Sequence, residues 1–419
     1  MKLLVVCQYF YPEQFRINDV CFHLSEMGHD VTVLTGLPNY PTGDIFCGYE
    51  WDSLKTNALQ KSNHGYYEPI IGSYIEMVNR VKIIRCKLTP RKTGKFNLVI
   101  NYYSFMHNAS KAIKAMSQNS YCFDRILVSQ YSPVTMAIPA ILFKRKYKNN
   151  VPMYIYCHDI WPESIVSAGL QNSGPIYNII GILSKHIYKK ADKIFISSKN
   201  FEKYINEKHH IYHNIFYLPM YAESLYETEP VPVSSDKINL LFAGNIGEMQ
   251  SVETILYAAK ILQDKEKDNI HIHFVGDGSS FESCKELASN LSLKNITFHG
   301  RYQLEEMPRF YNMATAFIMT LKDNKEISYT LPNKVQSYLL AGKPIIASVN
   351  GESATVIKDA NCGLVCPAED HVALAGIITQ FAEEKGKQIE YGLNAKKYYD
   401  QNFSIDSFFE KLLTYMEIE

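Results

Sequence analysis

Short apolar runs of strand length alternate along the chain with longer segments whose apolar residues recur every three or four positions. In the first half, the strand-length runs are residues 2–7, 30–34, 125–128, 153–157 and 193–196. Residues 17–27 have helical periodicity and end at Gly28, a residue type that commonly follows a helix. Strands separated by helices form parallel sheets with helices on both faces. The pattern therefore predicts an α/β fold.

The same pattern restarts in the second half of the chain after an interruption. Residues 227–236 combine prolines, serines and acidic residues as linkers do. Beyond them we expect helices at 252–263 and 281–291, and strands at 239–242, 270–275, 296–299, 316–319, 344–347 and 363–365. The sequence thus predicts two doubly wound domains, residues 1–220 and residues 221–399. A C-terminal helix near residues 400–419 can pack back onto the first domain.

Composition narrows the class of protein. The 419 residues include 43 basic and 43 acidic side chains, and 46% of the residues are hydrophobic. This balance is typical of a soluble globular protein and gives no general attraction to nucleic acid. Nine scattered cysteines without a Cys-x-x-Cys pair indicate thiols in a reducing cytoplasm rather than a disulfide framework. No apolar run has the length of a membrane span.

In open parallel sheets, ligands bind beyond the carboxyl ends of the strands. In the second domain, residues Gly244, Asn245 and Gly247 follow such a strand, where glycines let a backbone approach a phosphate. Farther along, Pro332 opens a helix that Gly342 closes. The amides of this helix start, with Asn333 and Lys334, can hold a diphosphate.

The first domain has polar side chains at the equivalent strand ends. His158 and Asp159 follow the strand at 153–157 directly, and they are candidates for a substrate contact or a proton transfer. The neighbouring loops offer groups suited to a hydroxylated ligand, namely Glu13, Arg16, Asn18, Asp19 and Tyr40. The histidines His209, His210 and His213 lack an acidic partner of metal-site spacing, so we expect them at the surface.

A basic tract runs from Met77 to Phe123 without one acidic residue. Its first part carries Arg80, Lys82, Arg85, Lys87, Arg91, Lys92 and Lys95, with aromatic residues interleaved farther on. Cations together with aromatic side chains suit an anionic membrane surface, and single-stranded nucleic acid attracts the same mixture. A solvated surface over core aromatics is the third interpretation.

The chain has no Asp-x-Asp pair of the kind that holds a divalent ion against a nucleotide diphosphate. If the substrate is linked to a nucleotide, protein cations and helix ends must therefore stabilise the leaving diphosphate. We expect no metal and no cofactor.

Taken together, several segments resemble family 4 glycosyltransferases, over nearly the whole chain. The resemblance is strongest to the branch that acts in bacterial O-antigen, lipopolysaccharide, colanic acid and capsule assembly, including L-fucosamine transferases. It rests on Tyr11-Pro12-Glu13-Gln14-Phe15-Arg16-Ile17-Asn18-Asp19, His158-Asp159-Ile160-Trp161-Pro162-Glu163-Ser164, Leu218-Pro219-Met220-Tyr221-Ala222-Glu223, Gly244-Asn245-Ile246-Gly247 and Pro332-Asn333-Lys334-Val335-Gln336-Ser337-Tyr338-Leu339. The resemblance implies the GT-B architecture, in which two Rossmann-like domains face a cleft.

The resemblance also implies roles for single residues. His158 matches the active-site histidine of the family, which contacts the donor sugar. Asn245 and Gln250 stand where the family has an arginine and a lysine on the donor phosphates, so Lys334, Arg301 and helix amides are expected to compensate. Tyr329 and Ser337 stand in the place of a family glutamate pair, and the hypothesised substitutes are Glu326 and Gln336.

The implied reaction is metal-independent transfer of a sugar, with N-acetyl-L-fucosamine as one possibility, from a UDP-linked donor to an undecaprenyl-diphosphate-linked saccharide. Such an enzyme is expected in the cytoplasm, at the inner face of the cytoplasmic membrane, with no nucleic-acid partner. Three alternatives remain open from the residues: a nucleotide-sugar 2-epimerase, a non-catalytic nucleotide-sugar sensor and, last, a nucleic-acid-binding protein.

Overall fold

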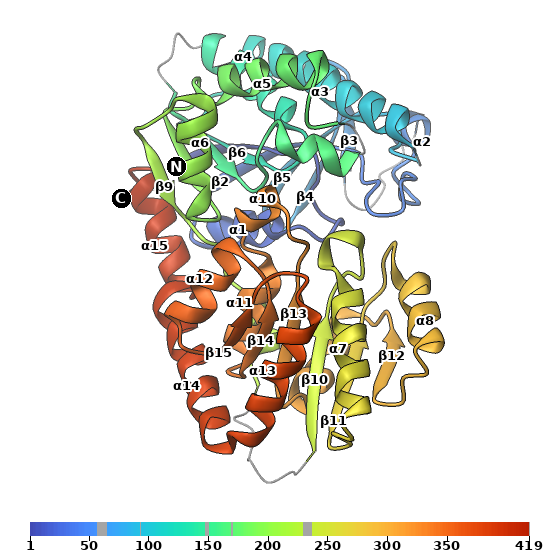
Figure 1. Ribbon diagram of the computed structural model, residues 1–419. Coiled ribbons are helices and arrows are strands. Elements are labelled where there is room, and N and C mark those ends of the chain that lie inside the picture. The colour runs from blue at the N-terminus through green and yellow to red at the C-terminus, as the bar shows by residue number, and fades with distance from the viewer. Residues whose placement is uncertain (57–64, 93, 147–150, 169–170, 229–236, 419) are drawn as a thin grey trace. The chain divides into compact units, whose positions relative to one another are not determined.

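The computed structural model describes residues 1–56, 65–92, 94–146, 151–168, 171–228 and 237–418 (Figure 1). The chain divides into two compact units. The first unit comprises Met1–Ser197, Phe201–Tyr217 and Leu413–Glu419, and the second comprises Ser198–Asn200 and Leu218–Leu412. The sequence places the boundary after residue 220, close to the main crossing between Tyr217 and Leu218. Most of the expected linker, residues 229–236, lies outside the described residues.

The first unit is built on one sheet with the strand order β3-β4-β5-β2-β1-β6-β7-β8-β9 among the described residues. The parallel strands are β1 (Lys2–Val6), β2 (Asp30–Gly36), β5 (Val81–Cys86), β6 (Arg125–Gln130), β7 (Met153–Cys157), β8 (Lys193–Ile196) and β9 (Ile215–Tyr217). At one edge, β3 (Gly65–Glu68) and β4 (Ser73–Val78) pair in antiparallel fashion and β4 pairs with β5 in the same way.

The helices of the first unit cover both faces of this sheet. Right-handed crossovers place α1 (Arg16–Glu26), between β1 and β2, on the face opposite to the helices that connect β5 through β8. Those helices are α3 (Lys95–Gln118), α4 (Ile138–Lys146) and α5 (Pro175–Tyr188). They form one outer layer, in which α3 packs against α4 and the short turn η2 (Val134–Ala137) contacts all three (Figure 1). The remaining described helices are α2 (Trp51–Thr56) and α6 (Asn200–His209).

The second unit contains a parallel sheet with the strand order β12-β11-β10-β13-β14-β15 in the described chain. Its strands are β10 (Ile238–Ala243), β11 (Ile270–Val275), β12 (Ile296–Gly300), β13 (Ala316–Thr320), β14 (Ile345–Ser348) and β15 (Gly363–Cys366). A separate apolar cluster packs on each face of this sheet. All six strands lie within one residue of the ranges that periodicity predicts.

Helices of the second unit connect these strands and extend beyond them. They are α7 (Val252–Asp264), α8 (Phe281–Asn290), α9 (Met307–Met313), α10 (Lys325–Ser328), α11 (Asn333–Leu340), α12 (Gly351–Asp359), α13 (His371–Glu383), α14 (Lys385–Asn402) and α15 (Ile405–Tyr415). The chain from Leu413 onward belongs to the first unit. There the carbonyl of Met416 accepts hydrogen bonds from Arg125 Nε at 3.1 Å and from the Tyr154 hydroxyl at 3.2 Å.

Two expectations about the first unit need correction. The strands expected in the first unit do not include β3, β4, β5 or β9. Of these, β5 lies within the basic tract and carries Lys82 and Arg85. His209 is fully buried rather than on the surface, because its Nε2 is 2.8 Å from the Trp161 carbonyl and its ring packs near Tyr188 and Tyr204. Among the described residues, no helix is both long and apolar enough to cross a lipid bilayer.

Candidate functional site

In the second unit, the loops that follow β10 and β11 touch one another. A Cβ atom on Gly276 would lie only 1.8 Å from the carbonyl oxygen of Gly244. Both residues have positive φ, 131° at Gly244 and 140° at Gly276, a region that L side chains rarely adopt. The two glycines therefore allow a close backbone crossing at the carboxyl edge of the sheet.

Several amides of the loop after β10 already donate hydrogen bonds inside the protein. The N–H groups of Gly244 and Ile246 donate to the carbonyls of Val275 and Asp277, each at 2.9 Å. The N–H of Gly247 donates to Oε1 of Gln250 at 3.2 Å, and the same oxygen accepts from Asn245 Nδ2. The N–H groups of Gly244 and Gly247 thus already have acceptors inside the protein, and the phosphate contact of this loop stays a prediction.

Tyr338 connects helix α11 to strand β10 through hydrogen bonds. The Tyr338 hydroxyl accepts a hydrogen bond from the Ala243 N–H and donates one to the Ala243 carbonyl, each at 3.0 Å. The Tyr338 ring stacks on Phe317 with 4.0 Å between centroids. Residues four apart lie on the same face of a helix. Because Tyr338 bonds to Ala243, the face that carries Lys334 is turned toward the end of β10.

The ammonium group of Lys334 is buried and has no hydrogen-bond partner in the described part of the chain. Its Nζ lies 4.2 Å from the centroid of the Phe242 ring and 3.6 Å from the point where a Cβ on Gly244 would stand. Burial lowers the pKa of Lys334 to about 8. A buried charge without a partner is costly, so this position indicates a site that an anion completes.

The other predicted donor-site residues surround Lys334 less directly. Pro332 precedes α11 and Asn333 is exposed at the helix start. Ser337 donates to the Asn333 carbonyl at 3.3 Å, and the Gln336 amide nitrogen, in the orientation that satisfies it, lies 3.0 Å from the Pro332 carbonyl. Gln336 and Ser337 thus bond within their own helix turn. Two further residues lie at the same sheet edge, exposed Arg301 after β12 and half-buried Glu326 in α10.

In the first unit, His158 is held between aromatic rings at the end of β7. Its ring stacks on Tyr131 at 4.1 Å and 7°, and the Tyr156 ring is also 4.1 Å away. Its Nε2 lies 3.3 Å from the Ser129 hydroxyl. Burial lowers the pKa of His158 to about 3. The imidazole is therefore neutral near pH 7 and can exchange hydrogen bonds with a ligand without carrying charge.

Asp159, the neighbour of His158, is anchored by Ser132. The Ser132 hydroxyl donates to Asp159 Oδ2 at 2.7 Å and accepts from Trp161 Nε1 at 3.3 Å. Burial raises the pKa of Asp159. The carboxyl group thus helps to fix the loop that carries His158.

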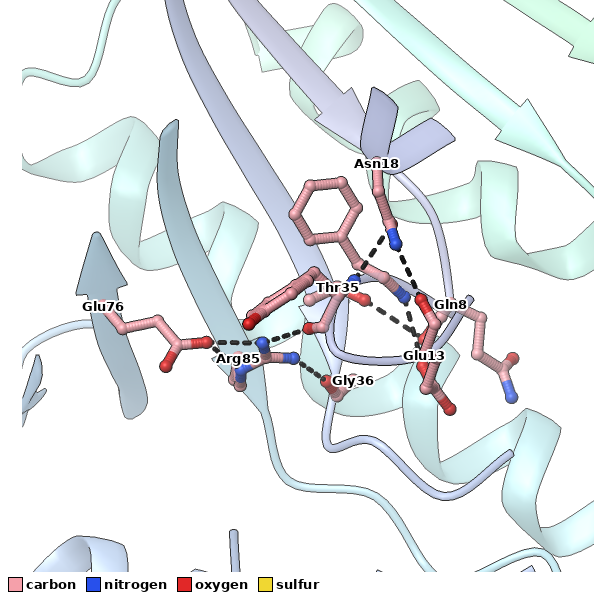
Figure 2. A network of polar contacts seen from close by, with 9 residues as sticks. Gln8, Glu13, Asn18, Thr35, Gly36, Glu76 and Arg85 are labelled. Carbon is pink, nitrogen blue, oxygen red and sulfur yellow. Dashed lines mark hydrogen bonds and ion pairs between the residues drawn. The ribbon is translucent and has the colours of Figure 1, made fainter. Parts of the chain in front are cut away.

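Glu13 organises the loop after β1, as Figure 2 shows. Its Oε1 accepts from the N–H groups of Asn39 and Tyr40 at 2.9 and 2.8 Å, and its Oε2 accepts from Phe10 at 3.1 Å. Asn18 Nδ2 donates to the Glu13 carbonyl at 2.7 Å. Burial raises the pKa of Glu13 to about 7. Glu13 and Asn18 therefore shape this rim through internal hydrogen bonds.

Two further predicted acceptor contacts, Arg16 and Asp19 in the first turn of α1, form an ion pair at 2.9 Å. The Tyr40 ring is 38% exposed and lies near Tyr9 and Phe15, at 5.7 and 5.3 Å between centroids. An exposed aromatic surface of this kind suits the apolar face of a sugar ring.

Arg85 is a core residue, and its assignment to a membrane surface is wrong. Its side chain is fully buried and forms an ion pair with Glu76, which is 3% exposed. Its guanidinium also donates to the Gly36 carbonyl at 3.3 Å and to the Tyr11 carbonyl (Figure 2). Arg85 therefore joins three segments of the first unit and cannot reach a lipid.

The remaining cations of the basic tract have different surroundings. The Arg91 guanidinium lies over the Tyr40 ring at 5.5 Å, among the predicted acceptor residues, and Lys82 lies near Tyr121 at 5.7 Å. Both are half-buried, whereas the exposed members are Arg80, Lys87, Lys92 and Lys95. The tract is thus not one continuous cationic surface.

Sequence reasoning missed two residues that position the candidate groups, Tyr131 and Tyr338. Tyr131 follows β6 directly, so the rule that examines strand ends could have found it. Tyr338 stands four residues after Lys334, the spacing of a shared helix face. No group of three or more His, Cys, Asp or Glu side chains in the described chain is arranged to hold a metal ion, and metal independence stays a prediction.

Comparison with known proteins matches the second unit to a family. Residues 227–398 match the family model "Glycosyl transferases group 1". Over 253 residues the chain is 25% identical to "Probable glycosyltransferase WbjE" of Pseudomonas aeruginosa. The matched region covers 57% of this chain and 62% of that protein. The chain thus spans about three fifths of that relative. It is also 20% identical over 361 residues, 82% of each chain, to WcaI of Escherichia coli (strain K12), a candidate colanic acid biosynthesis glycosyl transferase.

A solved structure with the same fold covers the whole chain. Anabaena Alr3699/HepE in complex with UDP superimposes with a TM-score of 0.70 at 12% sequence identity, over 100% of both chains. The expected fold class is confirmed: the protein is α/β, with two Rossmann-like units of the GT-B type.

Proposed function

We propose that this chain, whose residues 227–398 match the family model "Glycosyl transferases group 1", is a glycosyltransferase that transfers a sugar from a nucleotide diphosphate to an acceptor hydroxyl. The observation that carries the proposal is the buried Lys334 ammonium at the carboxyl edge of the second sheet, which has no hydrogen-bond partner among the described residues. A nucleotide diphosphate supplies the anionic oxygens that this group lacks. UDP is the proposed nucleotide, since HepE was solved with UDP.

Lys334 acts on the leaving group in this proposal. When the bond between the anomeric carbon and the diphosphate oxygen breaks, negative charge grows on the diphosphate. A fixed cation in a site shielded from water stabilises that charge, and one such group is worth about 3 kcal/mol. Arg301, Asn333 and the start of α11 are the proposed further phosphate contacts, and Glu326 the proposed contact to the donor sugar.

The first unit supplies neutral and aromatic groups for sugars. His158 remains uncharged near pH 7, so it exchanges hydrogen bonds with hydroxyls of the donor sugar and is not a general acid there. Tyr40 offers its exposed ring to the acceptor saccharide, next to Arg16, Asp19 and Arg91. The anchored Asp159 and Glu13 keep these loops in place.

The acceptor and the cellular place are also proposed. We infer an undecaprenyl-diphosphate-linked saccharide of bacterial surface polysaccharide as the acceptor, because the relative WcaI is described with colanic acid biosynthesis. The corresponding place is the cytoplasm, at the inner face of the cytoplasmic membrane. N-acetyl-L-fucosamine is the first donor sugar to test, because the sequence motifs resemble transferases of that sugar.

The test screens UDP-sugars, UDP-N-acetyl-L-fucosamine among them, for thermal stabilisation of the full chain, with Lys334→Met as the matched control. The best donor is then incubated with and without a diphospholipid-linked saccharide. Release of UDP that depends on the acceptor, with a labelled lipid product, supports a transferase. A changed sugar on the nucleotide without an acceptor identifies an epimerase, binding without turnover identifies a sensor, and equal stabilisation of the variant contradicts the role of Lys334.

A further inference from the structure

Helix α5 leaves three isoleucines uncovered, two in its first half and one at its middle. Ile176, Ile179 and Ile182 are 61%, 64% and 71% exposed. They are spaced three residues apart and so form one stripe along the helix. The described buried residues of α5 all belong to its second half, namely Ser184, Ile187 and Tyr188. The helix is thus anchored at one end and presents isoleucines to the outside at the other.

Helix α3, in the same layer, carries a second uncovered stripe at its beginning. Phe96, Val99 and Tyr103 are 77%, 52% and 60% exposed and are spaced three and four residues apart. On α4, which packs against α3, Leu142 is 38% exposed. All three helices cover the same face of the first sheet (Figure 1). Their exposed sides therefore belong to the outer side of one layer, turned away from the sheet.

The layer is also free of acidic side chains. The sequences of α3, α4 and α5 contain no aspartate or glutamate, although 43 of the 419 residues in the chain are acidic. Exposed cations lie on these helices or directly after them: Lys95, Lys111, Lys114, Arg145, Lys146, Lys189 and Lys190. Lys144 does not contribute, because it pairs with Asp192 at 2.6 Å.

From these observations we propose that the outer side of the α3–α4–α5 layer docks onto a lipid bilayer that contains anionic lipids. Neighbouring stripes of exposed apolar side chains on a monomer mark an interaction surface. Helices with apolar residues to insert and cations to meet the headgroups bind at the membrane interface. A second copy of the chain is a poorer occupant, because it would bring the cations of two layers together.

This inference does not rest on the proposed reaction. It also places the lipid contact outside residues 80–92, because Arg85 is buried in the core and Arg91 lies over the Tyr40 ring. Of the cations first assigned to the membrane, Lys95 alone lies within the three helices.

The experiment measures sedimentation of the full chain with vesicles of phosphatidylcholine alone and with phosphatidylglycerol added. Wild type is expected to bind the anionic vesicles, and binding should fall as salt rises. The variant I176S/I179S/I182S is expected to lose about tenfold or more in partition. Charge reversal by K189E/K190E should reduce binding to the anionic vesicles.

Two controls make changes of the same kinds outside the three helices. The variant I389S/L393S removes side chains of similar exposure, 52% and 63%, from α14 in the second unit and should bind as wild type. Charge reversal by K87E/K92E changes two exposed cations outside the helices by the same amount and should have a smaller effect than K189E/K190E. Circular dichroism melting verifies that each variant is folded.

Three outcomes overturn the proposal. The first is that wild type does not bind phosphatidylglycerol vesicles. The second is that the triple isoleucine variant binds them as well as wild type does. The third is that analytical ultracentrifugation shows a wild-type dimer that this variant abolishes. The last result would assign the surface to a second copy of the chain.

Discussion

Two buried cations, Arg85 in the first unit and Lys334 in the second, have opposite surroundings. Arg85 pairs with Glu76 and donates to two carbonyls, so each charge and acceptor has a partner inside the protein. The Lys334 ammonium has only the face of Phe242 beside it within the described residues. Both lie where sheet strands end, yet Arg85 is paired inside the fold, whereas the Lys334 ammonium has no anionic partner among the described residues.

The difference teaches how to separate structural from functional charge. Burying an ion costs several kcal/mol, and a protein that uses the ion for stability supplies its counter-charge. Arg85 and Glu76 follow that rule on adjacent strands. Lys334 violates it, and burial lowers its pKa to about 8 as a consequence. A violation of this kind points to a ligand site.

The largest effect is expected when Arg85 is replaced. We expect Arg85→Met to lower the free energy of unfolding by about 3–5 kcal/mol, because Glu76 is left buried without its partner. Urea unfolding followed by circular dichroism measures this. The double variant R85M/E76L should recover part of the loss, since it removes both charges. A loss below about 1 kcal/mol for Arg85→Met would mean that the pair is not a structural centre.

Lys334 should show the converse behaviour. Lys334→Met is expected to reduce turnover of the best UDP-sugar about a hundredfold, since one preorganised charge contact to the leaving diphosphate is lost. The free energy of unfolding without ligand should stay level or rise, because an unpaired buried charge is removed. Activity assays and urea unfolding on the same samples test both parts. A variant as active as wild type would remove Lys334 from the site.

Glu13 extends the comparison to a buried acid. Glu13→Gln should cost about 1–3 kcal/mol of unfolding free energy at low pH, because one of the three N–H donors loses its acceptor. Burial raises the folded pKa from 4.5 to about 7. Wild type therefore loses stability relative to the variant as pH rises from 4.5 to about 7. Parallel curves for both proteins over that range would show that Glu13 is ionised throughout.

The smallest expected effect is the pH dependence of UDP binding. Since the pKa of free Lys334 is about 8, an increasing share of the protein loses its ammonium above that pH. The affinity of wild type for UDP should then fall about tenfold for each further pH unit, and that of Lys334→Met should not. Isothermal titration calorimetry between neutral and alkaline pH measures both. A flat wild-type profile would contradict contact between this group and the phosphates.

Prediction from sequence worked best where the signal was local. Strands β7 and β11 lie at the predicted ranges because continuous apolar runs flanked by turns are readable without knowledge of partners. Strands β4 and β5 were missed because Arg85 and Glu76 break the expected pattern of apolar and polar residues. Their charges cancel only when the strands pair, and pairing is not visible along the chain.

The sequence by itself determined the α/β class, the six strands of the second sheet, and the choice of Lys334 as a candidate phosphate contact. Periodicity, glycines and prolines act over a few residues, so they can be interpreted one segment at a time. Only the tertiary structure decided that Lys334 is buried over Phe242, that Arg85 belongs to the core, and that the isoleucines of α5 are uncovered. Burial and ion pairing depend on groups distant in sequence, because desolvation is set by everything packed around a charge.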